Sequence, residues 1–389
     1  MILNDIDNAY VGGSGADKIY LGEDIIWDKS GPTPPTPVPY EQQYLTIEAL
    51  EDGDLNVNSE SLEYSINDGE WIHAATTPTV LPLQNGDKVR FRSNANHSFT
   101  GLFTGNTISF NVYGNIESLE YGDNFSGTTS VRSPSAFTSC FRSCSGLTDA
   151  SNLVLPATAL TSSCYRLMFQ SCTSLTSAPE LPATTLSEYC YYHMFKGCTS
   201  LTTVPSILPA TTLASNCYAY MFGDCTNLTT PPELPATALT SNCYYGMFNG
   251  CTSITTAPEL PATTLANYCY SNMFNGCTSL VQAPELPATT LVRNCYYRMF
   301  EGCTGLTSAP ELSATTLVNS CYSNMFSGCT SLNYIKCLAT DISATNCTNN
   351  WVDGVAASGT FVKDPSMTSW TTDASGIPSG WAVVDNVSQ

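Results

Sequence analysis

The chain has 389 residues, which is enough for two or three domains, and 42% of them are hydrophobic, so a sizeable core can form. Only 12% are charged, and acids outnumber bases by 33 to 13, which gives a net charge of −20. This excess of negative charge argues against nucleic-acid binding and against attachment to an anionic membrane surface.

The sequence shows no targeting or membrane-spanning segment. No apolar run approaches the ~20 residues that cross a bilayer, so membrane insertion is not expected. The first seven residues carry Asp5 and Asp7 where a secretory signal needs a basic end and then an apolar run. We therefore do not expect export by the general secretory route.

Residues 1–29 are expected to form a small β module. Apolar patches at 9–11, 19–21 and 25–27 are separated by turn residues, which predicts a short β meander. A module of this size is not stable alone, so we expect it to dock onto a partner. The string Lys-Ile-Tyr-Leu-Gly-x-x-x-x-Trp at 18–27 resembles an N-terminal module of tail and fibre proteins of phages of gut bacteria. That resemblance implies docking onto other virion proteins.

A linker and an all-β domain follow. Prolines crowd residues 30–39, which predicts an extended, semi-rigid spacer. From 40 to 128, alternating apolar residues such as those at 62–66 and 108–112 predict strands. Asn67-Asp68-Gly69 and Asn85-Gly86-Asp87 are turn signals between the strands. A sandwich-like all-β domain is the simplest interpretation.

An internal repeat dominates the second half of the chain. The pattern Cys-Tyr-x-x-Met-Phe-x-x-Cys recurs in steps of 26 residues, with one step of 27. Its copies open at Cys164, Cys190, Cys217, Cys243, Cys269, Cys295 and Cys321. A degenerate copy comes before them, with Phe141 and Cys144 at the Phe and second Cys positions. One unit of this length cannot bury its own apolar face, so the copies are expected to stack.

Within each copy the apolar residues fall at i, i+1, i+4, i+5 and i+8, which predicts one face of a short helix. The following Leu-Thr-x-Ala fits an extended rung, and Pro-Glu-Leu-Pro then forces a turn. The expected repeat core is represented by two copies. Its residues are Cys190, Met194, Phe195, Cys198, Leu201, Cys217, Met221, Phe222, Cys225 and Leu228.

The pattern Met-Phe-x-Gly-Cys-Thr-Ser-Leu-Thr resembles the BspA-type leucine-rich repeats of bacterial surface proteins. The resemblance implies an α/β leucine-rich-repeat solenoid of about seven to eight 26-residue repeats over residues 129–340. The small all-β domain and the N-terminal β module would come before it. Residues 341–389 contain Trp351, Trp370 and Trp381 among Gly, Ser and Pro, and are expected to cap the open end.

The 18 cysteines allow three interpretations. Cys164 and Cys172 would lie about 12 Å apart along a helix, too far for a disulfide. Buried reduced thiols are therefore favoured, with some inter-repeat bridges as an alternative. Zinc is disfavoured, because there is no Cys-x-x-Cys and the three histidines are scattered. We expect no metal site and no cofactor.

One repeat position holds a row of glutamates, which are Glu180, Glu233, Glu259, Glu285 and Glu311. The 27-residue repeat interrupts this row with Ser206-Ile207. The row is expected to be a solvated ridge; a weak cation site and a ligand-facing stripe are the alternatives.

The residues just before the first Cys and the two after the Tyr change freely between copies, so they are expected to face solvent. Their Tyr, Ser, Asn, Gly and Arg side chains suit adaptable recognition, although neutral drift on an exposed face gives the same variation. The candidate ligand-facing residues are Tyr192, His193, Tyr220, Tyr245, Tyr268, Arg293, Tyr297 and Arg298.

The order of docking module, spacer, β domain and repeats favours a phage adhesion protein in the tail or fibre of the virion, assembled in the host cytoplasm. It would bind a host surface glycan or protein through the repeats. A bacterial cell-surface adhesin is the main alternative, and a purely structural virion decoration protein is another. An enzyme such as a polysaccharide depolymerase would need paired carboxylates in a groove, so catalysis is not expected. A homo-oligomer stays open, because fibre-like assemblies are often symmetric although no coiled-coil pattern is present.

Overall fold

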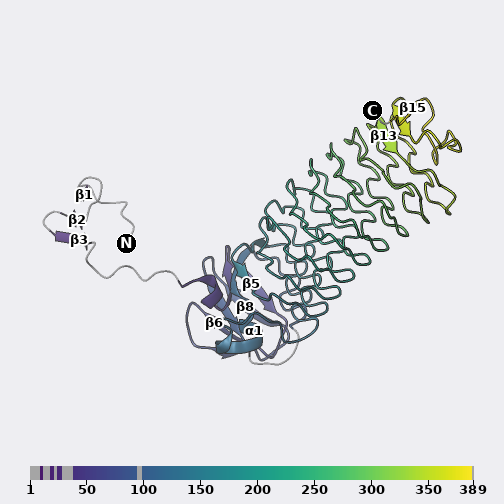
Figure 1. Ribbon diagram of the computed structural model, residues 1–389. Coiled ribbons are helices and arrows are strands. Elements are labelled where there is room, and N and C mark those ends of the chain that lie inside the picture. Colours follow the sequence, from purple (N-terminus) through teal and green to yellow (C-terminus); the bar gives the residue numbers. More distant parts are fainter. Residues whose placement is uncertain (1–8, 12–17, 22–23, 29–37, 94–98, 388–389) are drawn as a thin grey trace. The chain divides into compact units, whose positions relative to one another are not determined.

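The computed structural model describes residues 9–11, 18–21, 24–28, 38–93 and 99–387. The chain divides into two compact units, 1–39 and 40–389 (Figure 1). In the first unit, β1 (Ala9–Val11), β2 (Lys18–Leu21) and β3 (Asp24–Asp28) form an antiparallel sheet in that order. Most of the proline-rich segment, residues 30–37, lies outside the described residues.

The second unit begins with an antiparallel sheet in which the apolar residue of each alternating pair faces inward. Leu45, Ile47, Val89 and Phe91 on its central strands are all fully buried. Its strands lie in the order β10 (Phe110–Asn115), β4 (Leu45–Ala49), β9 (Lys88–Arg92), β6 (Glu63–Ile66) and β7 (Ile72–His73). A separate pair, β5 (Gly53–Val57) and β8 (Thr79–Leu83), adds its apolar residues to the same core.

This sheet continues directly into the repeats. Strand β10 pairs in parallel with two short strands of the degenerate first copy, β11 (Leu147–Asp149) and β12 (Leu153–Val154). Rings also stack across the junction: Phe103 lies 5.1 Å from Phe141, which lies 5.5 Å from Phe169. The β domain thus supplies the surface on which the first repeat packs; from here on, one whole repeat of the stack is called a rung.

The repeat segments are not the helices that their spacing suggested. Within the described residues the structure has one α-helix, the four-residue α1 (Ser118–Tyr121), and the Cys-to-Cys segments are series of tight turns. Every fourth residue has a positive φ, as at Asn216 (57°), Tyr220 (51°) and Asp224 (60°), which an α-helix does not accommodate. The helical part of the expected α/β solenoid is therefore wrong. A spacing of four in turns resembles the helical repeat of about 3.6 over so few residues.

Backbone N–H groups alternate between two kinds of partner along each segment. The N–H of Met221 donates within the rung to the carbonyl of Tyr218 at 3.1 Å. The N–H groups of Tyr218 and Phe222 donate instead to the carbonyls of Cys243 and Met247 in the next rung, each at 3.0 Å. The same bonds therefore shape each turn and fasten each rung to its neighbour.

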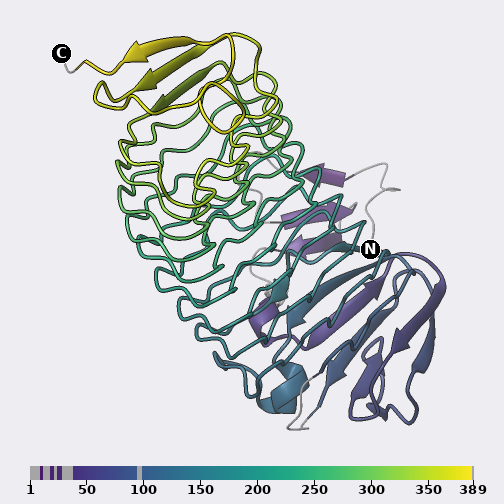
Figure 2. The ribbon, with the colours of Figure 1, turned by 90° about the vertical axis from the view of Figure 1, so that its right-hand side faces the viewer.

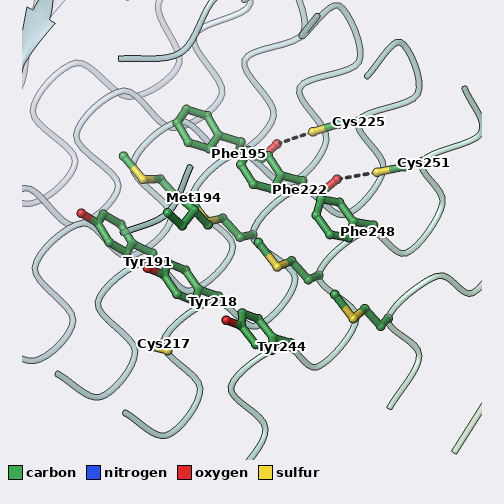
Figure 3. Close-up of a cluster of buried hydrophobic side chains, with 14 of the residues drawn as sticks. Tyr191, Met194, Phe195, Cys217, Tyr218, Phe222, Cys225, Tyr244, Phe248 and Cys251 are labelled. Atoms are coloured by element: carbon green, nitrogen blue, oxygen red, sulfur yellow. Dashed lines mark hydrogen bonds between the residues drawn. The ribbon is translucent and has the colours of Figure 1, made fainter. Parts of the chain in front are cut away.

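Identical side chains stack in columns inside the rungs (Figure 3). The rings of Tyr191, Tyr218 and Tyr244 lie 5.7 and 5.8 Å apart and almost parallel, beside a column of Phe195 and Phe222 with rings 5.6 Å apart. The ten representative core residues named from the sequence all have no solvent exposure; they are Cys190, Met194, Phe195, Cys198, Leu201, Cys217, Met221, Phe222, Cys225 and Leu228.

The second cysteine of each copy also makes a hydrogen bond. The Sγ of Cys225 donates to the carbonyl of Phe195 in the preceding rung at 3.2 Å, and Cys251 donates to Phe222 at 3.0 Å (Figure 3). All 18 cysteines are free and buried. The thiol thus acts as a small apolar side chain that also supplies one donor.

Outside the turn segments the rungs are extended and pair through isolated parallel bridges, such as Thr212 to Ala238. At the C-terminal end the pairing widens into a parallel sheet of β13 (Tyr334–Cys337), β14 (Thr360–Lys363) and β15 (Ala382–Asp385) (Figure 2). The ring of Trp351 lies 6.1 Å from Tyr322, so the columns extend beyond residue 340. Among the described residues, no helix has the length and apolarity needed to cross a membrane.

Candidate ligand-binding face

We call the surface of the turn segments the turn face; it comprises residues 134–143, 162–171, 188–197, 215–224, 241–250, 267–276, 293–302 and 319–328. Three left-handed positions recur in every segment. Glycine fills most of the third, and Asn, Ser or Tyr fills the first. The middle position varies most, and its occupants along the array are Ser139, Leu167, His193, Tyr220, Gly246, Asn272, Arg298 and Asn324.

Large side chains at the middle position are energetically unfavourable for the fold. A left-handed conformation costs a residue with a Cβ roughly 1–2 kcal/mol, and only Gly and to a lesser degree Asn escape this cost. Gly246 and Asn272 show that the fold accepts both at this position. His193, Tyr220 and Arg298 nevertheless occupy it with φ of 56°, 51° and 55°. Backbone strain that persists where Gly or Asn would adopt the same conformation at lower cost points to a role for the side chain itself.

Five rings form a continuous aromatic strip across three rungs. Tyr189 packs edge-on against Tyr192 at 5.5 Å, and Tyr192 stacks on His193 at 3.9 Å. His193 then meets Tyr220 edge-on at 5.1 Å, and Tyr220 meets Tyr245 in the same way at 5.3 Å. Edge-to-face contacts of this kind hold the rings in fixed orientations. We call these five residues the aromatic strip.

Two cations lie on the strip. The guanidinium of Arg166 is 5.4 Å from the ring centre of Tyr192, and the Nζ of Lys196 is 4.6 Å from that of Tyr220. Burial, together with the charges of Lys196 and Arg166, lowers the pKa of His193 to about 4, so its imidazole is neutral at physiological pH. Among the described residues, the buried Nε2 of His193 has no hydrogen-bond partner.

A second group of candidate residues lies further along the same face. Arg293 stands 6.0 Å from the ring centre of Tyr268, and Arg298 stands 5.1 Å from that of Tyr297. Arg298 also approaches Glu301, with its Nε 3.4 Å from the carboxylate. The structure thus brings Tyr192, His193, Tyr220 and Tyr245 together in the aromatic strip. The other four candidates form two separate pairs on later rungs, Tyr268 with Arg293 and Tyr297 with Arg298.

The candidates are less exposed than the sequence suggested. Arg293 is exposed, but the other seven are half-buried, and the variable pair Ser271 and Asn272 has only 0% and 8% exposure. The expectation that both positions after the Tyr face solvent is therefore wrong as a general rule. The side chains lie along the stack and cover one another. Gly246 shows this directly, because a Cβ there would lie 2.5 Å from the ring of Tyr220.

The glutamate row forms a different surface, which we call the Pro-Glu edge; it comprises residues 178–182, 204–209, 231–235, 257–261, 283–287 and 309–312. Its five glutamates are all exposed, and Ile207 replaces glutamate in the 27-residue repeat, facing Glu233 across a backbone bridge. A groove of about 570 Å³ separates the rungs of Glu259 and Glu285, lined mainly by prolines, alanines and Leu260.

Sequence reasoning missed a buried carboxyl pair beneath the first rung. Glu117 and Glu120, at the short helix α1, are 0% and 1% exposed. Burial raises the pKa of Glu117 to about 9, and the neighbouring charge of Glu120 acts in the same direction. Arg132 donates its backbone N–H to Glu120 at 2.8 Å, whereas neither carboxyl oxygen of Glu117 has a hydrogen-bond partner among the described residues. No residue pattern marked this pair, because its burial comes from the packing of the β domain against the repeats.

The described residues contain no group of three or more His, Cys, Asp or Glu side chains arranged to hold a metal ion. The chain matches the model of a known protein family. The model of the BspA type leucine-rich repeat region matches residues 106–255 and 239–349, in six copies. No curated protein matches the chain. The match begins in the β domain, ahead of the first full Cys-Tyr copy, which agrees with the ring stack that starts at Phe103.

Proposed function

Because the chain belongs to the BspA-type leucine-rich-repeat family, we propose that it is a binding protein whose turn face recognises a ligand on a cell surface. The leucine-rich repeats indicate a role in protein interaction or adhesion. Stacked repeats present an extended surface, and such surfaces serve binding in other repeat proteins. The proposal assigns the chain no catalytic reaction.

The observation that carries the proposal is the strained aromatic strip. Tyr220 and His193 occupy left-handed positions where Gly246 and Asn272 show that cheaper residues fit. Tyrosine offers a large contact area at a low cost in side-chain entropy, which suits recognition. Neutral drift would favour Gly or Asn at these positions, because each large residue lowers the stability of the fold. The aromatic strip is therefore the part of the surface that we assign to the ligand.

We further propose that the chain is a component of a phage tail or fibre, which binds a host surface glycan or protein. The arrangement of the chain supports this. Residues 1–39 form a unit separate from 40–389, as an attachment module for other virion proteins would. Free thiols throughout the core suit a protein that folds and assembles in a reducing cytoplasm.

Cell binding provides the test. Fluorescently labelled full-length protein is incubated with intact candidate host bacteria, beside the variants Tyr220→Ala and Tyr245→Ala and the control Glu259→Gln on the Pro-Glu edge. We expect the wild type and the control to stain the cells and the two tyrosine variants to lose most of the staining. Staining that survives in both tyrosine variants, or is absent with the wild type, refutes the assignment of the turn face.

The BspA-type repeats favour one alternative, a bacterial cell-surface adhesin. Immunogold labelling with an antibody against the chain separates the two. Gold on the tails of phage particles supports the virion proposal, whereas gold on the bacterial envelope supports the adhesin. Gold on particles together with no staining of cells by the protein indicates a structural decoration protein.

A further inference from the structure

Charge is segregated along the repeat array. Between residues 136 and 330, all five cations lie in turn segments; they are Arg142, Arg166, Lys196, Arg293 and Arg298. The same segments carry three acids, Glu188, Asp224 and Glu301, whereas the Pro-Glu edge carries five acids and no cation. In a chain with net charge −20, the turn face is thus a local region of positive charge.

Two arginines on this face have the geometry of anion receptors. Arg166 and Arg293 each lie over a tyrosine ring, and within the described residues neither forms an ion pair. The face of a ring holds the guanidinium plane while leaving its edge N–H groups available. Those N–H groups match a carboxylate, which can accept two parallel hydrogen bonds. Acids are abundant in this chain, so arginines left without one are poised for an external anion.

We propose that the ligand of the turn face is an acidic polysaccharide whose carboxylates are bound by Arg166 and Arg293. The inference rests on the proposed function and names the ligand class. Arg166 belongs to the rung that opens at Cys164 and Arg293 to the one that opens at Cys295, which is five rungs further on. Successive tyrosine rings are 5.7–6.1 Å apart along the stack, so one sugar residue cannot reach both arginines. The ligand is therefore a polymer with repeated carboxylates.

The backbone explains why a polysaccharide fits better than an acidic peptide. A peptide bound along a stack of rungs uses either free backbone groups, as an added strand, or deep apolar pockets for its side chains. On the turn face the backbone N–H groups already donate within the rung or to the next rung, as at Tyr220 to Tyr245 (2.7 Å). The remaining groups are tyrosine rings and hydroxyls with Asn and Ser side chains, which suit the faces and hydroxyls of sugars.

The test measures binding of the full-length protein to three polymers: polygalacturonate, neutral dextran and poly-L-glutamate. The variants are Arg166→Gln and Arg293→Gln, and the matched control is Arg142→Gln, an exposed turn-face arginine that lies over none of the described rings. Thermal unfolding verifies that all four proteins are folded. We expect polygalacturonate to bind and dextran not to bind. Each of the two variants should weaken binding about tenfold, the range for a charge-assisted hydrogen bond, and the control should weaken it less than threefold.

Each other outcome has a definite meaning. Equal loss with Arg142→Gln shows a diffuse charge effect and overturns the assignment of the two arginines. Tighter binding of poly-L-glutamate, with the same arginine dependence, assigns the site to an acidic peptide and overturns the polysaccharide. Failure of every polymer, with cells still stained through Tyr220 and Tyr245, refutes this inference and leaves the proposed function in place. Failure of both polymer binding and cell staining refutes the two together.

Discussion

Replacing Gly246 with Ala tests whether the aromatic strip is built into the stack. The added Cβ would lie 2.5 Å from Cε1 of Tyr220 and 2.7 Å from its Cδ1, closer than real contacts allow. Gly246 also has a φ of 59°. We expect Gly246→Ala to lower the free energy of unfolding by roughly 1–2 kcal/mol through the left-handed backbone. Pushing the Tyr220 ring off its rotamer should lower it by a further ~1 kcal/mol.

A double-mutant cycle separates the two effects. The free energy of unfolding is measured by denaturant titration for the wild type, Gly246→Ala, Tyr220→Ala and the double variant. The backbone cost remains in every background, but the steric cost disappears once the Tyr220 ring is removed. We expect Gly246→Ala to cost about 1 kcal/mol less in the Tyr220→Ala background. Gly276→Ala is the control, because a Cβ there meets its nearest neighbour at 3.7 Å. Equal costs for Gly246→Ala in both backgrounds would refute the reasoning.

Three further predictions concern the buried groups. Cys225→Ala removes the thiol that donates to Phe195 and should lower the free energy of unfolding by about 1 kcal/mol; an unchanged unfolding midpoint would contradict the role of this bond. Burial raises the pKa of Cys190 to about 12, and all 18 thiols are buried, so a thiol-specific alkylating reagent should label the native protein slowly and all 18 cysteines after unfolding, as counted by mass spectrometry. The pKa of Glu117 is raised to about 9 from an ordinary 4.5, so its contribution to stability is complete below pH 4.5 and falls as the pH rises towards 9. The difference in unfolding free energy between wild type and Glu117→Gln should therefore decrease between pH 5 and 9, by up to about 1.4 kcal/mol per pH unit, and a flat difference would show that Glu117 titrates normally.

The repeat and its core could be predicted from the sequence, but the local conformation could not. The core side chains of a repeat point inward in the turn segments as they would in a helix, so the apolar pattern does not discriminate between the two conformations. In one repeat these residues are Cys217, Tyr218, Met221, Phe222 and Cys225. The signal that distinguishes the two conformations lies in the residues between the core positions. Residues that tolerate a positive φ recur every fourth position, which a helix does not require.

One copy displays that signal plainly. Asn242, Gly246 and Gly250 follow one another at intervals of four, and all three are left-handed. The copy at Tyr220 hides it, because a large residue stands where Gly or Asn is expected. Tyr220 belongs to the proposed ligand face, where recognition of a ligand would oppose the local preference for Gly or Asn.

The buried acid Glu117 and the partial burial of the variable residues could not be predicted. Both depend on contacts between chain segments that only the stacked structure brings together. The close approach of the Tyr220 ring to Gly246, where an added Cβ would lie 2.5 Å from it, is of the same kind, because it arises across rungs that are 26 residues apart in sequence.

The bonds between rungs have a consequence for how this protein changes in evolution. The backbone hydrogen bonds of each rung join it to the rung before and the rung after. The seven Cys-Tyr copies follow one another at intervals of 26 residues, with one interval of 27. A whole 26-residue unit can therefore be gained or lost by unequal recombination without disturbing the units further away. The near-identity of the Ala-Pro-Glu-Leu-Pro-Ala-Thr stretches favours such exchange at the level of the gene. Copy number then sets the length of the array, while under the proposed function substitutions on the turn face change the ligand that it binds.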